Sequence, residues 1–356
     1  MNNGPPPPDP RTRTLLGIQI LGTGSYVPEN VVTNEDLRDT HGFDPEWIIN
    51  RTGIQERRFA PPHQATSDLC AIAATRCLES AKVNPRDVDL LVVGTFTPDM
   101  SFPSAACIVQ DRLKLTCPAF DLQAACAGFA YALVTACQFV AAGTSQLALV
   151  IGGDCNSRII NPKDEKSFPL FGDGAGAVLL AQGSPQQGLV AYQLGSDGSG
   201  GDLLNRPAGG SRMPPNSEAL AQGLHYLTMD GRAVFRWAVR ILTDTSNAVL
   251  NHASASIHDV RWFIPHQANI RIIHSASDVL GFHRDVVFKN LERFGNTSAG
   301  TIPIAFDELL REGLIERGDL ILTSGFGAGL AWGTLLWRLQ SCKLRMHKSV
   351  LPILYQ

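Results

Sequence analysis

The sequence predicts a layered α/β fold made of two similar halves. Short runs of Val, Ile, Leu and Ala alternate with segments of helical period along most of the 356 residues, and this alternation is typical of sheets covered by helices. Several landmarks recur about 170 residues further on, which indicates duplicated domains rather than a short-period array. Apolar residues make up 44% of the chain and charged residues 18%, a composition typical of a well-packed globular enzyme.

The expected strands are short apolar runs bounded by turn residues. They are Gly17–Leu21, Leu90–Gly94, Leu147–Ile151, Ala175–Leu180, Gly188–Leu194, Arg261–Ile264, Leu320–Thr323 and Ala331–Trp337. The expected helices have apolar residues at helical spacing. They are Ser67–Lys82, Ser104–Leu113, Gly128–Ala142, Ala233–His252, Ile270–Leu280 and Thr301–Glu312.

Three landmarks indicate the duplication. A long helix, an Asp-Val pair and a strand recur from residue 87 to residue 259, an offset of 172. The strand at Leu147 matches the strand at Leu320 at an offset of 173, and the turn at Cys126 matches the turn at Asn296 at an offset of 170. We therefore expect a Pro-rich disordered lead, two halves, and a tail of unassigned role. Their bounds are 1–13, 14–185, 186–339 and 340–356.

Charge and cysteine content exclude several classes of protein. Thirty Lys and Arg residues against thirty-three Asp and Glu give a net charge of −3, which argues against binding to nucleic acid or an anionic membrane by bulk charge. No apolar run approaches the roughly 20 residues of a membrane span, and the start lacks the order of a secretory signal. The eight cysteines form no Cys-x-x-Cys pair, so we expect no metal site and a reducing, cytoplasmic setting.

The first candidate catalytic residue is Cys126, which lies in the small-residue segment Asp121–Phe129. Its position at a strand-to-helix turn places the thiol at a helix N-terminus, which favours a thiolate. We expect Gly128 to relax this turn. The alternative is an inert buried thiol, the usual state of a cysteine in an apolar run. The turn and the small neighbours favour a nucleophile.

Three motifs of the second half point to the same chemistry. His266 ends an apolar strand just before a helix, where α/β folds keep catalytic groups, and a neutral imidazole there could polarise a carbonyl or share a proton with a thiol. Asn296 lies in the turn Gly295–Gly300, and the local sequence by itself indicates only a helix cap. Its position in the repeat, opposite Cys126, favours a side-chain amide that faces the same cleft as Cys126. The Gly-rich turn Ser324–Gly329 ends a strand and can aim backbone N–H groups at an oxyanion.

The segments Ala125–Gly128, His266–Asn269 and Gly295–Ser298 together resemble the motifs of β-ketoacyl-acyl-carrier-protein synthase III. The resemblance runs from about Gly17 to Leu339. It implies the thiolase-like α/β fold, with duplicated βαβαβαββ halves stacked in five layers (αβαβα). It also implies the reaction that initiates fatty acid synthesis, in which an acetyl or other short acyl-CoA acylates the enzyme and malonyl-acyl-carrier protein then condenses with loss of CO2. CoA thioesters are substrates here, so no cofactor is implied.

The resemblance assigns a catalytic role to four positions. Cys126 would carry the acyl group as a thioester. His266 and Asn296 would donate hydrogen bonds to the malonyl thioester carbonyl as CO2 leaves, stabilising charge that appears only in the transition state. The backbone N–H groups of Cys126 and Ala328 would form the hole for the acyl oxygen.

Binding roles are implied for a second set of positions. The CoA entrance would consist of Trp47, Arg51, Thr52, Arg158 and Asn269. There the indole would stack on the adenine opposite Arg158, Arg51 and Thr52 would meet the pyrophosphate, and Asn269 would contact the pantetheine arm. The planar guanidinium of arginine can stack on a base and bind a phosphate through two hydrogen bonds, so arginine suits a nucleotide better than lysine does.

Protein partners are implied by three further positions. Arg236 and Arg271 match a basic patch that docks the acidic carrier protein, a steering interaction that salt weakens. Phe102 matches an aromatic that crosses a homodimer interface into the acyl pocket of the partner. Residues 42–46 depart from the usual lead into the Trp47 helix.

Other functions remain open at this point. A relative of the same fold could transfer the acyl group to an oxygen or amine nucleophile, or prime a polyketide. A Cys-His hydrolase would use water as the acceptor, and a binding module would do no chemistry. The presence of both His266 and Asn296 favours decarboxylation, because plain acyl transfer needs a base but no donors for an enolate.

Overall fold

Two five-stranded sheets form the centre of the computed structural model, which describes residues 11–316 and 318–339. The first sheet has the order β2-β8-β7-β5-β6 and consists of Ile18–Tyr26, Gly174–Gln182, Leu147–Asp154, Leu90–Gly94 and Ala119–Leu122. The second has the order β1-β9-β14-β13-β12 and consists of Arg13–Leu16, Gly188–Ser196, Ala331–Arg338, Leu320–Gly327 and Val260–Pro265. Most of the predicted lead and all of the predicted tail lie outside the described residues.

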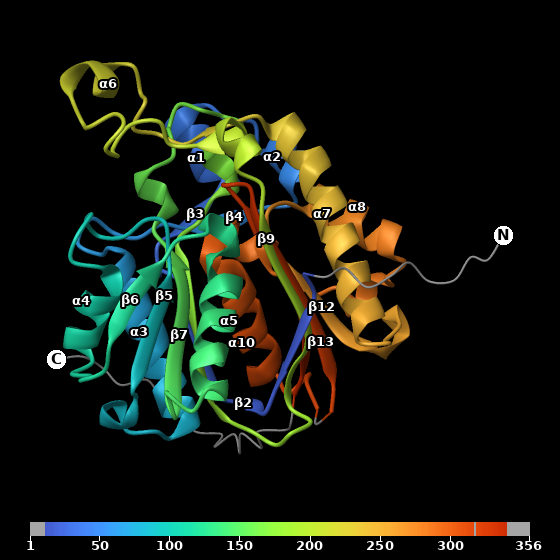
Figure 1. Ribbon diagram of the computed structural model, residues 1–356. Helices are drawn as coiled ribbons and strands as arrows, with labels where there is room; N and C mark the ends of the chain where they lie inside the picture. Colours follow the sequence, from blue (N-terminus) through green and yellow to red (C-terminus); the bar gives the residue numbers. More distant parts are fainter. Residues whose placement is uncertain (1–10, 317, 340–356) are drawn as a thin grey trace.

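Helices fill the space between the sheets and cover both outer faces (Figure 1). The middle layer is α5 (Gly128–Ala141) and α10 (Thr301–Arg311). The outer helices are α3 (Thr66–Ala81) and α4 (Ala105–Arg112) on the first sheet, and α7 (Gly231–His252) and α8 (Ile270–Leu280) on the second. The predicted arrangement of five layers, αβαβα, is confirmed.

The middle layer follows from side-chain composition. Helix α5 contains no charged residue along its 14 positions, and a helix that is apolar over most of its surface must be largely buried; only Gln138, Phe139 and Ala141, near its C-terminal end, are exposed. One apolar cluster joins α5 and α10 to both sheets. It includes Phe129 and Leu133, Ile302 and Phe306, Val92 and Val150, and Ile264 and Ile321. Since α5 and α10 both start beside the centre of this layer, the residues at their N-terminal ends are brought together.

The two sheets repeat each other strand by strand. The order β2-β8-β7-β5 in the first corresponds to β9-β14-β13-β12 in the second. The counterpart of β6 is reduced to one parallel bridge between Phe263 and Val287. On the opposite edge β1 adds an antiparallel strand to β9, although its residues belong to the predicted N-terminal half. The domain boundary at residues 185 and 186 stays a prediction.

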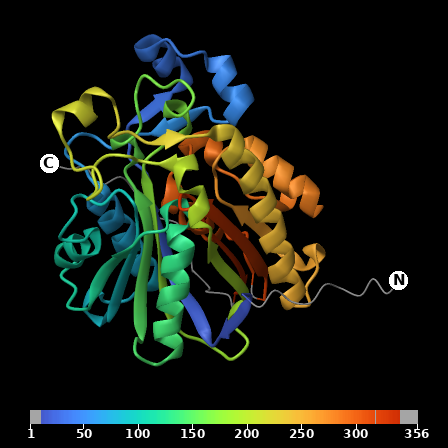
Figure 2. The ribbon, with the colours of Figure 1, turned by 45° about the horizontal axis from the view of Figure 1, so that its top comes forward.

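Several short elements were not expected from the sequence. These are β1 and β6 of the two large sheets, β3 (Val31–Thr33), β4 (Glu56–Arg58), α1 (Asn34–His41), α2 (Pro45–Thr52), α6 (Ser217–Ala221), α9 (Leu291–Phe294), and the pair β10 (Leu204–Asn205) and β11 (Thr228–Met229). None is longer than eight residues, so their apolar periodicity is too short to be recognised. Helices α1 and α2 lie at the top of the molecule near the start of α7 (Figure 2), and α2 packs on α8.

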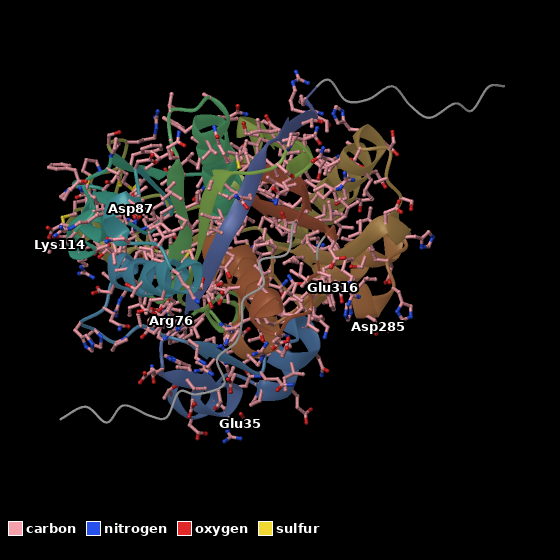
Figure 3. All side chains as sticks on the ribbon, turned by 90° about the horizontal axis from the view of Figure 1, so that it is seen from below. Glu35, Arg76, Asp87, Lys114, Asp285 and Glu316 are labelled. Atoms are coloured by element: carbon pink, nitrogen blue, oxygen red, sulfur yellow. The ribbon has the colours of Figure 1, made fainter. Side chains whose placement is uncertain are left out.

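Most charged side chains are directed outward from these layers, although Arg57, Asp154 and Asp173 are fully buried. Seen from below, six exposed ones are spread over the surface (Figure 3): Glu35, Arg76, Asp87, Lys114, Asp285 and Glu316. Among the helices of the described ranges, none combines the length and apolar content needed to cross a bilayer.

Candidate active site

One cavity of about 660 Å³ brings together ten of the twelve predicted site residues. They are Trp47, Arg51, Thr52, Cys126, Arg236, His266, Asn269, Arg271, Asn296 and Ala328. Arg158 and Phe102 are not among the residues that line it. The cavity therefore joins residues of both halves that are far apart in the sequence.

Two equivalent tight turns form the floor of the site. Cys126 lies in the turn Ala125–Ala127 before α5, and the turn Ser298–Gly300 precedes α10. Each begins with a residue in the left-handed region, Ala125 at φ +46° and Ser298 at φ +55°, a conformation that is strained for a residue with a Cβ. These two residues are 173 positions apart, which is also the offset between β7 and β13. The structural counterpart of Cys126 is therefore Ala299, and the expected match with Asn296 is wrong by three residues.

The glycine that the turn at Cys126 requires lies on a neighbouring strand and not in the turn itself. Gly128 has ordinary helical angles, φ −54° and ψ −41°, so the prediction that it relaxes the turn is wrong. At Gly327, at the end of β13, a Cβ would lie 2.6 Å from the backbone nitrogen of Cys126. Only glycine permits this approach. It places the next residue, Ala328, beside the nucleophile turn, as the predicted oxyanion hole requires.

The Cys126 side chain is 9% exposed and lies 3.2 Å from the Ser298 hydroxyl, which donates to the sulfur. Burial raises the pKa of the Cys126 thiol to about 12, and the Ser298 hydrogen bond opposes this rise. Burial disfavours the charged form, and here it outweighs the helix N-terminus that was expected to favour a thiolate. The resting residue is a thiol, so acylation needs a base.

His266 lines the same cavity as Cys126 and is the candidate for that base. Its side chain is 1% exposed, and burial lowers its pKa to about 3, so the imidazole is neutral at pH 7. The Thr301 hydroxyl lies 2.7 Å from Nδ1 and donates its only proton to the carbonyl oxygen of Ser298 at 3.0 Å. Thr301 must therefore accept from Nδ1–H, which assigns the free lone pair to Nε2.

Asn296 offers a hydrogen-bond donor to the cavity. Its Oδ1 accepts from the backbone N–H of Ser298 at 2.8 Å, which leaves the NH2 group as the free end of the side chain. The backbone is held from the first half: Asn296 donates to the carbonyl oxygen of Leu170 at 2.8 Å and accepts from Gly172 at 3.0 Å. Residues 170–172 thus fix the backbone of Asn296, and with it the position of the side-chain carboxamide. Sequence reasoning did not connect this segment with the site.

The expected CoA entrance lies on α2 and α8. Trp47 and Arg51 share one face of α2, with the guanidinium 6.0 Å from the indole ring. Asn269 caps α8 by accepting from Ile272 through Oδ1, so its NH2 group is free for a ligand. The Thr52 hydroxyl donates to the carbonyl oxygen of Ile48 at 2.6 Å. Its proton is therefore not free for the pyrophosphate contact that was expected.

Two predicted residues lie away from the cavity. The Arg158 guanidinium donates to the carbonyl oxygens of Ala60 at 3.2 Å and Pro61 at 2.7 Å. It is bound to the loop at residues 60–64, and the structure does not bring it together with Trp47 in the cavity. Phe102 is 84% exposed and has no place in the cavity of its own chain.

The cavity wall carries more positive charge than the sequence indicated. Besides the expected arginines, Lys166 and Arg232 also line it, giving five cations against one carboxylate, Asp164. Arg271 lies over the Phe235 ring at 5.4 Å. Lys166 and Arg232 were not predicted, because Lys166 lies in a loop and Arg232 at the start of α7, and neither has a recognisable motif around it. The charge balance favours an anionic ligand.

A second cavity of about 640 Å³ shares part of its wall with the first. The shared residues are Phe96, Ala125, Leu204, Leu227 and Ala328. The two spaces thus meet beside the Cys126 turn. Sequence reasoning did not find Phe96, Leu204 or Leu227, because single apolar residues from two loops and the two-residue strand β10 carry no local pattern. Among residues 11–316 and 318–339, no three His, Cys, Asp or Glu side chains are grouped to hold a metal ion.

Comparison with known proteins agrees with this geometry. The sequence model of 3-oxoacyl-[acyl-carrier-protein] synthase III matches residues 120–198, and that of its C-terminal part matches residues 250–339. The β-ketoacyl-[acyl-carrier-protein] synthase III of Rhodopirellula baltica is 50% identical over 342 residues, covering 91% of this chain and 99% of that protein. The protein of the same name from Caldanaerobacter subterraneus subsp. tengcongensis is 48% identical, covering 88% and 96%.

A solved structure extends the comparison to the fold. The 3-oxoacyl-[acyl-carrier-protein] synthase III of Aquifex aeolicus superposes with a TM-score of 0.83 at 40% identity. The match covers 90% of this chain and all of that one. Identity of this level over nearly the whole length establishes more than a shared fold. The chain belongs to the β-ketoacyl-acyl-carrier-protein synthase III family of condensing acyltransferases, which have the thiolase fold.

Proposed function

We propose that this chain takes an acetyl or other short acyl group from an acyl-CoA onto Cys126. It then condenses the acyl group with malonyl-acyl-carrier protein, yielding 3-ketoacyl-acyl-carrier protein and CO2, in the cytoplasm. One observation carries the proposal: a buried thiol, a neutral imidazole and a free carboxamide line one cavity. Decarboxylative condensation uses all three groups, whereas Asn296 would have no role in hydrolysis or in plain acyl transfer. CoA thioesters enter as substrates, and no resident cofactor is part of the reaction.

In the first half-reaction Cys126 attacks the acyl thioester. The thiol proton moves to Nε2 of His266, the sulfur forms a bond to the acyl carbon, and the bond from that carbon to the CoA sulfur breaks. The leaving CoA thiolate takes the proton, so His266 returns to its neutral form. The backbone N–H groups of Cys126 and Ala328 stabilise the tetrahedral oxyanion.

In the second half-reaction the malonyl unit loses CO2, and the electron pair of the broken bond passes into an enolate. The NH2 group of Asn296 donates to the enolate oxygen. His266 also donates through Nε2 in its other tautomer: between the half-reactions Nε2 takes a proton from solvent while Nδ1 gives one up to solvent, and Thr301 then turns its hydroxyl from the Ser298 carbonyl to Nδ1. The carbanion carbon attacks the acyl carbon and expels the Cys126 thiolate, which takes a proton from solvent, so that the condensation consumes one proton.

The overall activity is tested by incubating the protein with acetyl-CoA and malonyl-acyl-carrier protein. We expect CO2 release together with a 3-ketoacyl-carrier protein, and a transient acyl adduct on Cys126 when acyl-CoA is supplied alone. An acyl adduct that transfers to alcohols, amines or water, with no ketoacyl product, would contradict the condensation. A panel of acyl-CoA primers then separates fatty acid initiation from a specialised priming role.

The second cavity is proposed to receive the acyl chain, with Phe96 limiting its depth. Phe96→Ala removes a ring from the wall shared by both cavities, and we expect kcat/KM for a six-carbon primer to rise by about tenfold relative to acetyl-CoA. The measurement is condensation rate across a series of straight-chain acyl-CoAs. Phe139→Ala, at a partly exposed position on α5 outside both cavities, is the control. An unchanged ranking of primers would contradict the assignment.

We propose a homodimer in which Phe102 enters the acyl pocket of the partner. Support comes from the loop itself, in which Met100 is 50% and Phe102 84% exposed. Adjacent large apolar side chains at such exposure are typical of an interaction surface. Sedimentation of Phe102→Asp against the unchanged protein tests the assembly.

Carrier-protein docking is proposed for Arg236 on the exposed face of α7. Arg236→Glu is expected to raise KM for malonyl-acyl-carrier protein by about tenfold at low salt and less at high salt, because screening weakens such steering. The acyl transfer from acetyl-CoA should change little. Arg240→Glu is the matched control, since Arg240 is one turn along the same helix and does not line the cavity. Equal effects of the two variants would refute a specific docking role.

A further inference from the structure

A buried arginine on β4 lies next to the segment that fixes Asn296 and has no part in the reaction as described. The Arg57 side chain is fully buried and lines neither cavity. Burial lowers its pKa to about 10, so the guanidinium is still charged at pH 7. A charge that is removed from water is costly unless polar partners replace the solvent. The partners of Arg57 therefore show what its charge is used for.

The guanidinium connects two parts of the first half. Nη1 donates to the carbonyl oxygen of Val32 at 3.0 Å, and Nη2 donates to Oδ1 of Asn34 at 2.8 Å and to the carbonyl oxygen of Pro169 at 2.9 Å. All three acceptors are neutral oxygens, and hydrogen bonds from a charged donor are roughly twice as strong as those between neutral groups. Arg57 thus ties the small unit of β3, β4 and α1 to segment 169–172.

The same segment holds the backbone of Asn296 in the second half. The carbonyl oxygen of Leu170 accepts from the N–H of Asn296 at 2.8 Å, and the N–H of Gly172 donates to the carbonyl oxygen of Asn296 at 3.0 Å. A Cβ added at Gly172 or at Gly295 would lie 3.4 or 3.3 Å from the Cβ of Arg57. The stem of Arg57 therefore packs against both chains where they meet, one of them at the residue before Asn296.

We propose that Arg57 is a positioning residue for Asn296, which fixes, through segment 169–172, the place where the carboxamide meets the enolate. Arg57 itself touches neither substrate nor the reacting atoms. A donor to a developing oxyanion must be aimed accurately, and a displacement of about 1 Å can lower a rate on the order of 10²-fold. The inference rests on the proposed function in taking Asn296 as that donor. Because no enolate forms while Cys126 is acylated, loss of Arg57 should impair the condensation alone.

The first test compares the two half-reactions in Arg57→Lys. The lysine ammonium ends one bond short of the Nη atoms, so it keeps the buried charge and weakens all three hydrogen bonds. Acylation of Cys126 by acetyl-CoA, followed by intact mass, should stay within about twofold of the unchanged protein. Condensation of preformed acyl-enzyme with malonyl-acyl-carrier protein should fall by about tenfold. The loss is partial because Asn156 also donates to the carbonyl oxygen of Gly172, at 2.7 Å.

Equal losses in the two half-reactions, or no loss in either, would refute the proposal. Should Arg57→Lys fail to fold, Arg57→Gln, which removes the buried charge and keeps an amide donor, still decides. A normal ratio of condensation to acylation in that variant overturns the proposal.

The double variant tests whether Arg57 acts through Asn296. In the Asn296→Ala background the carboxamide that Arg57 positions is absent, so Arg57→Lys should cause little further loss of condensation. The same fold-loss in both backgrounds would refute an action through Asn296.

Amide hydrogen exchange gives a readout that needs no substrate. The backbone N–H groups of Asn296 and Ser298 are bound by the carbonyl oxygen of Leu170 and by Oδ1 of Asn296. We expect exchange in residues 294–300 to be about 3- to 10-fold faster in Arg57→Lys, because the frame around them is loosened. If the unchanged protein forms no ketoacyl product, the proposed function fails, whereas this measurement still decides whether Arg57 fixes Asn296. Unchanged exchange overturns the inference.

Asp89→Asn is the matched control. Asp89 also makes three hydrogen bonds to a segment distant in the sequence, accepting from the Ser145 hydroxyl and from the backbone N–H groups of Gln146 and Leu147. It lines neither cavity. Asp89→Asn should lower the melting temperature as Arg57→Lys does, while the ratio of condensation to acylation and the exchange in residues 294–300 stay unchanged. A selective loss of condensation in Asp89→Asn as well would show that lower stability alone disturbs Asn296, and would refute the role of Arg57.

Discussion

Cys126→Ala is expected to abolish both acyl transfer from acyl-CoA and formation of the ketoacyl product. Removing the nucleophile of a covalent mechanism lowers the rate by a factor on the order of 10⁴ or more, and Cys126 is the only cysteine among the described residues that line the cavity. The fold should be retained, because Ala125 and Ala127 already flank the position and only a buried sulfur is lost. Intact-mass measurement after incubation with acetyl-CoA should show no adduct.

A second buried cysteine provides the control. Burial raises the pKa of Cys155 to about 12, as it does for Cys126, but Cys155 lies beside Asp173 and does not line the cavity. Cys155→Ala should keep full acylation and condensation. If an acyl adduct persists in Cys126→Ala, or is lost in Cys155→Ala, the nucleophile has been assigned to the wrong residue.

The long apolar runs were predictable because both faces of their strands are buried. Strand β5 was expected at Leu90–Gly94 and occurs there, with all five residues buried. The same reasoning places β7, β8, β13 and β14, although each extends beyond the expected range. Strand β1 was not predictable: which sheet it joins depends on its pairing with β9, whose residues lie 172 to 179 positions further along the chain, and no local pattern encodes such a contact.

The meeting of Cys126, His266 and Asn296 was predictable from motifs, whereas their protonation was not. The turn sequence suggested a thiolate, but the pKa of a thiol depends on how deeply the whole fold buries it. Likewise, the sequence shows the hydroxyl of Thr52 and the guanidinium of Arg158 but not the carbonyl groups that bind them. Asp154 carried no signal at all, since a single aspartate at a strand end is common and its buried hydrogen bond to the backbone N–H of Ala299, 145 residues away, depends on the whole fold.

Asn296→Ala is expected to separate the two half-reactions. Acylation of Cys126 by acetyl-CoA should continue near its normal rate, because no enolate forms in that step. Condensation should fall by about 10²–10³, the usual loss when one donor to a developing oxyanion is removed. The two rates are measured separately, by intact mass after acyl-CoA and by ketoacyl product after malonyl-acyl-carrier protein is added to preformed acyl-enzyme.

The variant Asn296→Asp distinguishes a lost donor from a disturbed turn. Aspartate keeps an oxygen that can accept from the backbone N–H of Ser298, as Oδ1 of Asn296 does at 2.8 Å, but it offers no N–H to the enolate. It should therefore condense as poorly as the alanine variant while unfolding at a temperature closer to that of the unchanged protein. Condensation at the normal rate in either variant would show that the carboxamide is part of the turn and not of the chemistry, and the choice of decarboxylation over plain acyl transfer would lose its structural basis.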